Sequence, residues 1–166
     1  NEKARVGIIT ADESFPNLKE RREGFEEYCE QYPNIEIIKV ENDHFDLVKA
    51  VELYQSMVEG NQNIDTIVCM EGYGSIALSN ARLESQYSST KVIGFDLTEE
   101  TKKGLKEGII NGILTQKPYE MGYICIQSLA KYFETNSFET DRFYTSTILI
   151  TQDSIDEYME DQNEDN

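Results

Sequence analysis

The sequence predicts a doubly wound α/β fold, in which a mainly parallel sheet carries helices on both faces. Short apolar runs recur along the chain, and each is followed by a longer segment whose apolar residues are spaced three and four apart. Strands that alternate with helices in this way are typical of parallel sheets, because each helix crosses over to bring the next strand alongside. At 166 residues the chain is long enough for one domain with a buried core.

The first apolar run, residues 4–10, has the continuous hydrophobic character of a strand that is buried on both faces. Polar residues, glycine or proline separate the later runs from the segments of helical spacing. The expected strands are residues 4–10, 35–40, 64–70, 91–96, 112–115 and 145–150, and helices are expected to begin near residues 17, 46, 75, 98 and 118.

Residues that favour the start or the end of a helix lie where this order requires them. Asp46 and Thr98 are expected to cap the second and fourth helices, and Pro118 fits the first turn of the fifth. The residue three positions after Thr98 is Thr101 rather than Glu or Gln, so no capping box is expected there. Gly60 is expected to close the second helix.

Apolar stripes mark the helix faces that are expected to pack on the sheet. Arg21 is an exception, because it places a charge on the apolar side of the first helix, near its start. The stripes comprise Leu18, Arg21, Phe25, Tyr28 and Tyr32 in the first helix, Leu47, Val51, Tyr54 and Val58 in the second, and Tyr119, Tyr123, Ile126, Ala130 and Phe133 in the fifth.

The net charge is strongly negative, at −17 from 15 Lys and Arg against 32 Asp and Glu. This charge argues against nucleic acid or an anionic membrane surface as a partner, because both repel an acidic protein. It favours solubility, and it leaves a neutral or cationic small molecule as the ligand to consider. Residues 153–166 are dominated by Asp and Glu and are expected to fray into a disordered tail.

The cysteines give no sign of a metal site or of a disulfide framework. Cys29, Cys69 and Cys125 are widely spaced and include no C-x-x-C pair. Cys69 and Cys125 lie within apolar segments and are expected to be small buried residues. No apolar run approaches the ~20 residues that a membrane-spanning helix needs, and no signal peptide is visible.

Polar and aromatic residues that suit a binding site fall directly after the predicted strands. In an open parallel sheet the carboxyl ends of the strands meet at one edge, where ligands bind. A single residue there more often serves a loop or caps a helix, but a mixed group suits a polyol, because acids and amides bind hydroxyls and an aromatic ring covers the C–H face of a sugar. The candidates are Asp12 after the first strand, Phe45 after the second, Glu71 and Tyr73 after the third, Asp96 after the fourth and Gln116 after the fifth.

Several enzyme classes are disfavoured by the motifs of the chain. There is no G-x-G-x-x-G, no G-x-x-x-x-G-K-[ST] and no G-x-S-x-G, so neither a nucleotide cofactor nor a serine nucleophile is indicated. Residues 72–75, Gly-Tyr-Gly-Ser, have no neighbouring lysine, which disfavours a phosphate cradle. His44 is the only histidine and lies in an acidic loop, where a solvated role is expected. A response-regulator receiver is disfavoured because Glu71, rather than an aspartate, ends the third strand.

Separated motifs of the chain resemble type I periplasmic sugar-binding proteins, the ribose- and galactose-binding relatives of the LacI repressor effector domain. The resemblance implies one flavodoxin-like lobe of a protein whose two lobes are joined by three crossovers and hold a sugar between them. It implies that residues 1–152 are the C-terminal lobe with a late crossover strand and helix, and that the N-terminal lobe is missing. The motifs are ERREGF at 20–25, VIGFD at 92–96, KEGIINGILTQKPYEMGY at 106–123 and ITQDSIDEY at 150–158.

The resemblance also implies roles for residues by their position. Arg21 resembles an arginine that hydrogen-bonds sugar hydroxyls, and Phe45 resembles an aromatic residue that stacks on the sugar ring. Asp96 resembles a carboxylate that accepts from hydroxyls, and Gln116 an amide on the hinge side. Many members have an asparagine–aspartate pair after the third strand, whereas Tyr73 stands nearest to the usual asparagine in this chain.

A solute-binding component, for a sugar, of an ABC importer or of a sugar-sensing receptor is the function that the resemblance implies. Such a protein performs no chemistry, acts outside the cytoplasm in the periplasm or on a membrane anchor, and responds by closing its lobes on the ligand. The implied partners are the sugar, the missing N-terminal lobe, a membrane permease or sensor protein, and a second copy of the fragment as a homodimer. No metal or cofactor is implied. Two alternatives stay open, the effector-binding half of a cytoplasmic LacI-type regulator and an enzyme on a flavodoxin-like scaffold.

Overall fold

A computed structural model of the chain describes residues 3–60, 63–83, 89–138, 140 and 142–164. Its strands are β1 (Ala4–Thr10), β2 (Ile35–Asn42), β3 (Thr66–Cys69), β4 (Lys91–Phe95), β5 (Gly112–Thr115) and β6 (Ile148–Ile150). Its helices are α1 (Pro16–Cys29), α2 (Leu47–Glu59), α3 (Gly72–Leu83), α4 (Glu99–Lys106), α5 (Pro118–Thr135) and α6 (Ile155–Glu164).

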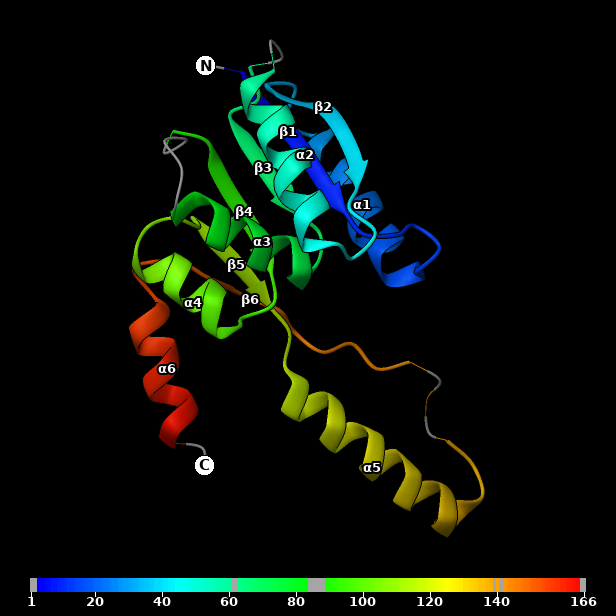
Figure 1. Cartoon of the computed structure of the whole chain (residues 1–166). Coiled ribbons are helices and arrows are strands. Elements are labelled where there is room, and N and C mark those ends of the chain that lie inside the picture. The colour runs from blue at the N-terminus through cyan, green and yellow to red at the C-terminus, as the bar shows by residue number, and fades with distance from the viewer. Residues whose placement is uncertain (1–2, 61–62, 84–88, 139, 141, 165–166) are drawn as a thin grey trace.

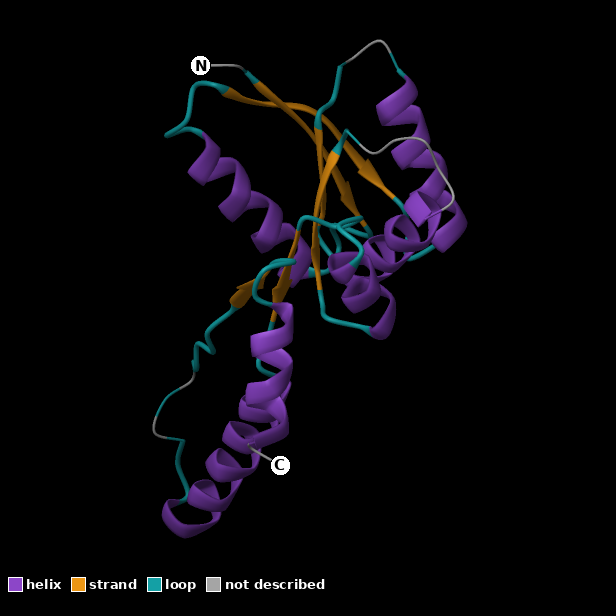
Figure 2. Cartoon of the chain, turned by 90° about the vertical axis from the view of Figure 1, so that its left-hand side faces the viewer, coloured by secondary structure: helices purple, strands orange, loops and turns teal. Residues whose placement is uncertain are grey.

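These strands form a six-stranded sheet in the order β2-β1-β3-β4-β5-β6. The pairs from β2 to β5 are parallel, whereas β6 pairs antiparallel with β5. Helices lie on both faces of the sheet, as Figures 1 and 2 show. The doubly wound, mainly parallel α/β fold that the sequence predicts is therefore confirmed.

Apolar side chains form a buried layer on each face of the sheet. The larger layer packs α2, α3, α4 and α6 against the strands, and Leu53, Leu78 and Leu105 are among its buried members. On the other face, Val6 belongs to a smaller cluster against which Phe25 of α1 packs. These layers hold the strands side by side and so determine where the loops at the carboxyl edge begin.

The predicted helix caps are confirmed, and one more capping motif is present. Asp46 caps α2 by accepting from the backbone N–H groups of Val48 at 2.8 Å and Lys49 at 3.1 Å. The expectation that α4 lacks a capping box was wrong: the Thr98 hydroxyl accepts from the Thr101 N–H at 3.3 Å, and the Thr101 hydroxyl accepts from the Thr98 N–H at 2.8 Å. The short threonine hydroxyl reaches the donor that glutamate or glutamine satisfies in the usual motif.

Several bounds differ by a few residues from the prediction. β1 and β5 match it, β3 and β6 are shorter, and β2 is longer. The sequence predicts a loop over residues 71–74, but α3 already begins at Gly72, because the Glu71 side chain accepts from the backbone N–H groups that open the helix. The predicted end of this helix near residue 87, like residues 165–166, lies outside the described residues.

The predicted inward stripes of α1 and α2 are only partly right. Tyr28 and Tyr32 are exposed, and their ring centroids lie 5.4 Å apart on the surface. Helix α1 ends earlier than predicted, so Tyr32 lies outside it. In α2, Tyr54 and Met57 are buried but Leu47 is exposed. Spacing of three and four residues admits overlapping stripes on one helix, and packing selects between them.

Helix α5 carries the predicted apolar stripe but projects away from the sheet (Figure 1). Pro118 occupies its first turn as predicted, yet no residue of the helix is buried. Tyr119 and Phe133 are 85% and 78% exposed, and Cys125, which the sequence predicts to be buried, is exposed as well. The prediction that this stripe faces the sheet was wrong, because periodicity shows which face is apolar but not what covers it. Neither α5 nor any other described helix is long and apolar enough to cross a membrane.

The acidic C-terminal segment forms α6 rather than the disordered tail predicted for residues 153–166. Ile155 is 1% exposed and belongs to the larger apolar layer, against which Tyr158 also packs. Lys106 of α4 forms an ion pair with Asp156 at 2.7 Å. A few apolar residues are enough to dock this acidic segment on the core. The prediction of disorder was based on the acidic composition of the segment, which takes no account of these residues.

We predict that Ile155→Ala lowers the free energy of unfolding by about 2–5 kcal/mol, because it removes buried methyl groups where α6 docks. Urea unfolding followed by circular dichroism measures the change. The control is Val48→Ala, at a residue that is 69% exposed, where a change within about 0.5 kcal/mol is expected. Equally small changes in both variants would contradict the docking of α6.

Candidate ligand-binding site

A cavity of about 460 Å³ opens at the carboxyl edge of the sheet. It lies between α1 and the loops that follow β2, β3, β4 and β5. Every residue that the sequence predicts as ligand-binding, except Asp12, lines this cavity. Those residues are Arg21, Phe45, Glu71, Tyr73, Asp96 and Gln116.

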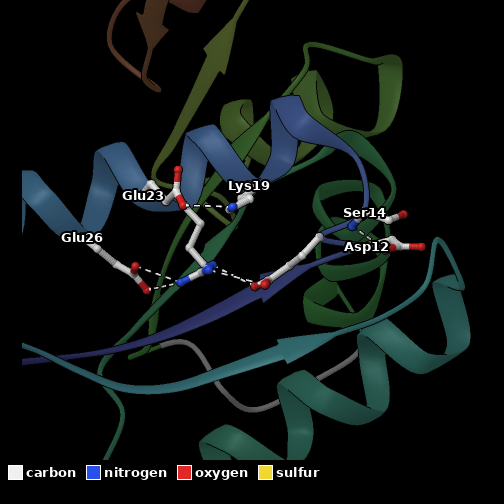
Figure 3. Close-up of polar contacts among 7 residues, drawn as sticks. Asp12, Ser14, Lys19, Glu23 and Glu26 are labelled. Atoms are coloured by element: carbon white, nitrogen blue, oxygen red, sulfur yellow. Dashed lines mark hydrogen bonds and ion pairs between the residues drawn. The ribbon is translucent and has the colours of Figure 1, made fainter.

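Asp12 is not among the residues that line the cavity. Its carboxylate accepts from the backbone N–H of Ser14 at 2.8 Å (Figure 3). This hydrogen bond lowers the pKa of the Asp12 carboxyl group. Asp12 therefore stabilises the turn that leads into α1, which is the commoner role for a polar residue at a strand end.

Arg21 reaches the cavity from α1, which explains why a charge interrupts the apolar stripe of that helix. Its Nη1 atom donates to the backbone carbonyl of Met70 at 2.9 Å, and its guanidinium carbon lies 4.4 Å from the centroid of the Phe95 ring. These contacts hold the guanidinium plane at the end of β3. Within the described residues Arg21 forms no ion pair, so no carboxylate competes for its other N–H groups.

The neighbouring Arg22 is engaged elsewhere and does not line the cavity. It forms ion pairs with Glu26 at 2.7 Å and with Glu13 at 2.8 Å. Hydrogen bonding to Glu26 raises the pKa of Arg22. Figure 3 shows this polar network along α1, beside the ion pair of Lys19 with Glu23 at 3.6 Å. Two adjacent arginines on one helix thus have different surroundings, one facing the cavity and one facing acids.

Asp96 and Gln116 meet where β4 and β5 end. Gln116 Nε2 donates to Asp96 Oδ1 at 3.0 Å, which fixes both polar groups at the cavity. The Asp96 N–H donates to the carbonyl of Leu114 at 3.0 Å, and the Thr101 hydroxyl donates to the carbonyl of Asp96 at 3.0 Å. These bonds hold Asp96 at a φ of +66°, in the left-handed region that L-residues rarely adopt.

Gly72 leaves the space that the Asp96 carboxylate occupies. A Cβ atom at position 72 would lie 3.1 Å from Asp96 Oδ2 and 3.3 Å from Asp96 Cβ. A larger residue at the start of α3 would therefore displace the carboxylate. The sequence shows a glycine-rich stretch at this point, but only the structure shows that it makes room for a side chain that follows β4.

Three aromatic rings line the cavity in a row. The Phe45 ring makes edge-to-face contacts with Phe15, at 5.4 Å between centroids, and with Tyr73, at 6.1 Å. All three side chains are exposed, so part of their surface is open to contact with a ligand. Sequence reasoning missed Phe15, although a large aromatic residue in an otherwise polar loop is the signal that marks it.

Glu71 lines the cavity, but its carboxylate is turned into the protein. It accepts from the backbone N–H of Tyr73 at 2.6 Å and from that of Gly74, and the residue is 4% exposed. Burial raises the pKa of Glu71 to about 7. Asp43 is also buried, and its pKa is raised for the same reason. Sequence reasoning missed Asp43, because one acid in a polar loop carries no pattern that marks it as buried.

The arrangement can bind a neutral polar molecule through its hydroxyl groups. Arg21 donates, Asp96 accepts and Gln116 does either, while the ring faces cover apolar carbon atoms. Among the described residues, no group of His, Cys, Asp and Glu side chains is placed to hold a metal ion. His44, the single histidine of the chain, is not part of the cavity lining.

A doubly wound sheet with a polar and aromatic cavity at its carboxyl edge defines the class of α/β lobes that bind small molecules between their loops. Residues 1–137 match the family described as periplasmic binding protein domain. The chain belongs to this family, as its motifs predict.

Solved structures of sugar-binding proteins share the fold. A solute-binding protein of an ABC transporter from Burkholderia graminis C4D1M, in complex with D-arabinose, is 25% identical with a TM-score of 0.83, and the match covers 92% of this chain and 54% of that one. GanP, a glucose-galactose binding protein from Geobacillus stearothermophilus, is 26% identical with a TM-score of 0.82, covering 91% and 54%. A carbohydrate transporter solute-binding protein from Agrobacterium radiobacter, in complex with D-arabinose, is 24% identical with a TM-score of 0.85, covering 95% and 54%. This chain spans about half the length of these proteins.

We predict that Asp96→Gly is more stable than Asp96→Ala by about 1 kcal/mol, because glycine adopts a positive φ without the steric cost that alanine meets. Both variants lose the carboxylate and its hydrogen bond to Gln116, so the difference between them isolates the backbone. Urea unfolding measures the two free energies. Equal stabilities would show that the backbone at this position is not strained.

Proposed function

We propose that this chain is the C-terminal lobe of a sugar-binding protein that serves an ABC importer or a sugar-sensing receptor and leaves its ligand chemically unchanged. The observation that carries the proposal is the cavity in which Arg21, the Asp96–Gln116 pair and the aromatic rings meet. Membership of the periplasmic binding protein family supports it, as do the sugar-binding proteins that have the same fold.

Each part of the cavity has a task in this proposal. Arg21 donates to two neighbouring hydroxyls, because its N–H groups are set in a rigid fork. Asp96 accepts from hydroxyls, and Gln116, oriented by its bond to Asp96, presents its carbonyl oxygen as a further acceptor. Phe45 and Tyr73 offer ring surface to the C–H face of the sugar. A ring with hydroxyls at its edge and C–H groups on its face matches this distribution.

We infer that residues 1–152, with helix α6 docked on them, form the second lobe with a late crossover strand and helix, and that a first lobe closes over the open side of the cavity. Two observations support this division. The match covers only 54% of the length of the proteins with the same fold. Helix α5 presents an apolar stripe that has no buried residue, as expected of a helix that docks on further chain. Closure of the lobes outside the cytoplasm is then the output that a membrane permease or a sensor protein detects.

We predict that sugars stabilise the two-lobed protein in which this chain is the proposed second lobe. Arg21→Ala should remove this stabilisation, because the sugar hydroxyls lose the two N–H donors of the guanidinium group. The measurement is a thermal-shift screen with D-arabinose, D-galactose, D-glucose and D-tagatose. A sugar at about a hundredfold excess over its dissociation constant contributes about 2.7 kcal/mol. The control is Arg22→Ala on the same helix, which breaks the ion pairs with Glu13 and Glu26 and should keep the shift.

Different outcomes of this screen have different meanings. Equal losses in the two arginine variants would indicate general damage to α1. The absence of a shift with any sugar in the unsubstituted protein would contradict the sugar assignment. Amino acids, nucleosides and peptides would then be the next ligands to test, because the same donors and acceptors bind them.

We also predict that the chain without a first lobe self-associates through α5, because a second copy can cover the apolar stripe. Ile126→Asp combined with Phe133→Asp should restore a monomer in size-exclusion chromatography with light scattering. Both residues are exposed, so the substitutions remove no buried contact within the lobe. Ser128→Asp, on the opposite side of the helix, is the control and should leave association intact. A monomeric unsubstituted chain at high concentration would contradict this prediction.

A further inference from the structure

We propose that Asp43 and Glu71 share one proton and that this buried carboxyl pair holds the Phe45 and Tyr73 rings in the cavity wall. The proton lies between Glu71 Oε1 and Asp43 Oδ2, and its loss loosens both rings. The effect on ligand affinity rests on the proposed sugar-binding function, whereas the shared proton and the ring positions do not.

Each carboxyl group accepts from the backbone N–H of one ring-bearing residue. Asp43 Oδ1 accepts from Phe45 at 2.9 Å, and Glu71 Oε2 accepts from Tyr73 at 2.6 Å. The two rings meet edge to face, with their centroids 6.1 Å apart. The carboxyl pair and the rings therefore form one connected unit across the loops that follow β2 and β3.

The turn that carries Phe45 depends on its bond to Asp43. His44 and Phe45 are consecutive residues with φ angles of +57° and +61°, which are costly for residues with a Cβ atom. Asp43 itself is anchored, because its N–H donates to the carbonyl of Thr10 at 2.8 Å. If the Asp43 side chain moves, the turn loses a hydrogen bond that holds this rare conformation.

Oxygen atoms of the two carboxyl groups converge beside Gly74. A Cβ atom at position 74 would lie 2.8 Å from Glu71 Oε1 and 3.1 Å from Asp43 Oδ2, so both oxygens border the same small space. Asp43 is fully buried, and its Oδ2 finds no donor among the described residues other than a protonated Glu71. Two ionised carboxylates this close together and buried away from water repel each other strongly. A proton shared between Glu71 Oε1 and Asp43 Oδ2 removes one charge and gives Asp43 Oδ2 its missing partner.

The surroundings of the pair favour the shared proton at neutral pH. Burial, together with repulsion from Asp43, raises the pKa of Glu71 to about 7. Burial raises the pKa of Asp43, and repulsion from Asp46, at the start of α2, adds to this rise, while the hydrogen bonds with the Phe45 N–H and with Glu71 lower it. Cys69 of β3 lies against the pair, and burial raises the pKa of its thiol. No Lys, Arg or His within the described residues offsets the charge of either carboxyl group.

The direction of the pH dependence follows from the raised pKa of Glu71. The folded protein keeps the proton at pH values where an unfolded chain, with a pKa of 4.5, has lost it. The stabilisation is therefore complete below about pH 4.5 and is lost as the pH rises through about 7. Above that pH both groups are charged and move apart, and the ring wall loosens. Asp43→Asn can place a side-chain N–H at the Oδ2 position, towards Glu71, while its carbonyl oxygen still accepts from Phe45. This variant keeps a hydrogen bond between the two side chains when Glu71 is ionised, so it should remove the dependence of the ring positions on pH.

NMR spectra of the ligand-free chain test the shared proton. We expect the backbone amide signals of Phe45 and Tyr73 to shift together with a midpoint near pH 7. Glu71→Gln should abolish this transition, and Asp43→Asn should lower its midpoint, because asparagine carries no negative charge. Glu52→Gln, at an exposed acid on α2, is the control and should leave the midpoint unchanged. Amides that titrate separately, or a midpoint that Asp43→Asn does not move, would overturn the shared proton.

The positioning of the rings has its own measurements. Nuclear Overhauser effects between the Phe45 and Tyr73 rings should weaken between pH 6 and pH 8 in the unsubstituted chain and persist in Asp43→Asn. Undiminished effects in the unsubstituted chain at pH 8 would overturn the positioning role. Calorimetry with D-arabinose and the proposed two-lobed protein should show an affinity about tenfold lower at pH 8 than at pH 6, as expected when only the protonated form binds. Asp43→Asn should bind equally at both pH values. Failure of D-arabinose, D-galactose, D-glucose and D-tagatose alike to bind would count against the proposed function, whereas the ligand-free spectra decide the proton and the rings independently.

Discussion

The parallel pairing of the strands is the constraint on which the site depends. β3 pairs with β1 on one side and with β4 on the other, in unbroken register, so the loops after these strands leave the sheet at one edge. Apolar layers on both faces hold this pairing, because slippage of a strand would break contacts in both layers. The cavity is built from α1 and several loops, so it exists only while the sheet keeps that alignment.

The helices that begin at this edge compete with a ligand for polar side chains. The first N–H groups of a helix need acceptors, and Asp46, Glu71 and Thr98 supply them for α2, α3 and α4. Those acceptors have little capacity left for a ligand. Asp96 differs, because its carboxylate receives a side-chain hydrogen bond from Gln116 at one oxygen only. The distinction between structural and binding residues therefore lies in their hydrogen-bond partners and not in their residue type.

The alternation of strands and helices, the helix caps and most residues around the cavity could be predicted because their signals are local. Arg21 and Asp96 were predicted from separate motifs and line the same cavity, although their role in binding stays a prediction. Burial could not be predicted in the same way, because it depends on segments distant in the sequence. Acidic composition concealed the docking of Ile155, and a polar loop concealed the burial of Asp43. The sequence of α5 shows that one of its faces is apolar, but it does not show which segment packs on that face.

The stability of this lobe and the completeness of its site depend on different surfaces. The larger apolar layer is closed by α2, α3, α4 and α6, so the core persists whether or not α5 is covered. The cavity, in contrast, is open, and the rings that line it remain exposed. Water competes there with a ligand for every hydrogen bond, so each bond contributes only about 0.5–1.5 kcal/mol. A covering lobe would exclude that water and strengthen the same bonds without moving a residue of this chain. Affinity should therefore depend on closure more than on any single side chain of the lobe.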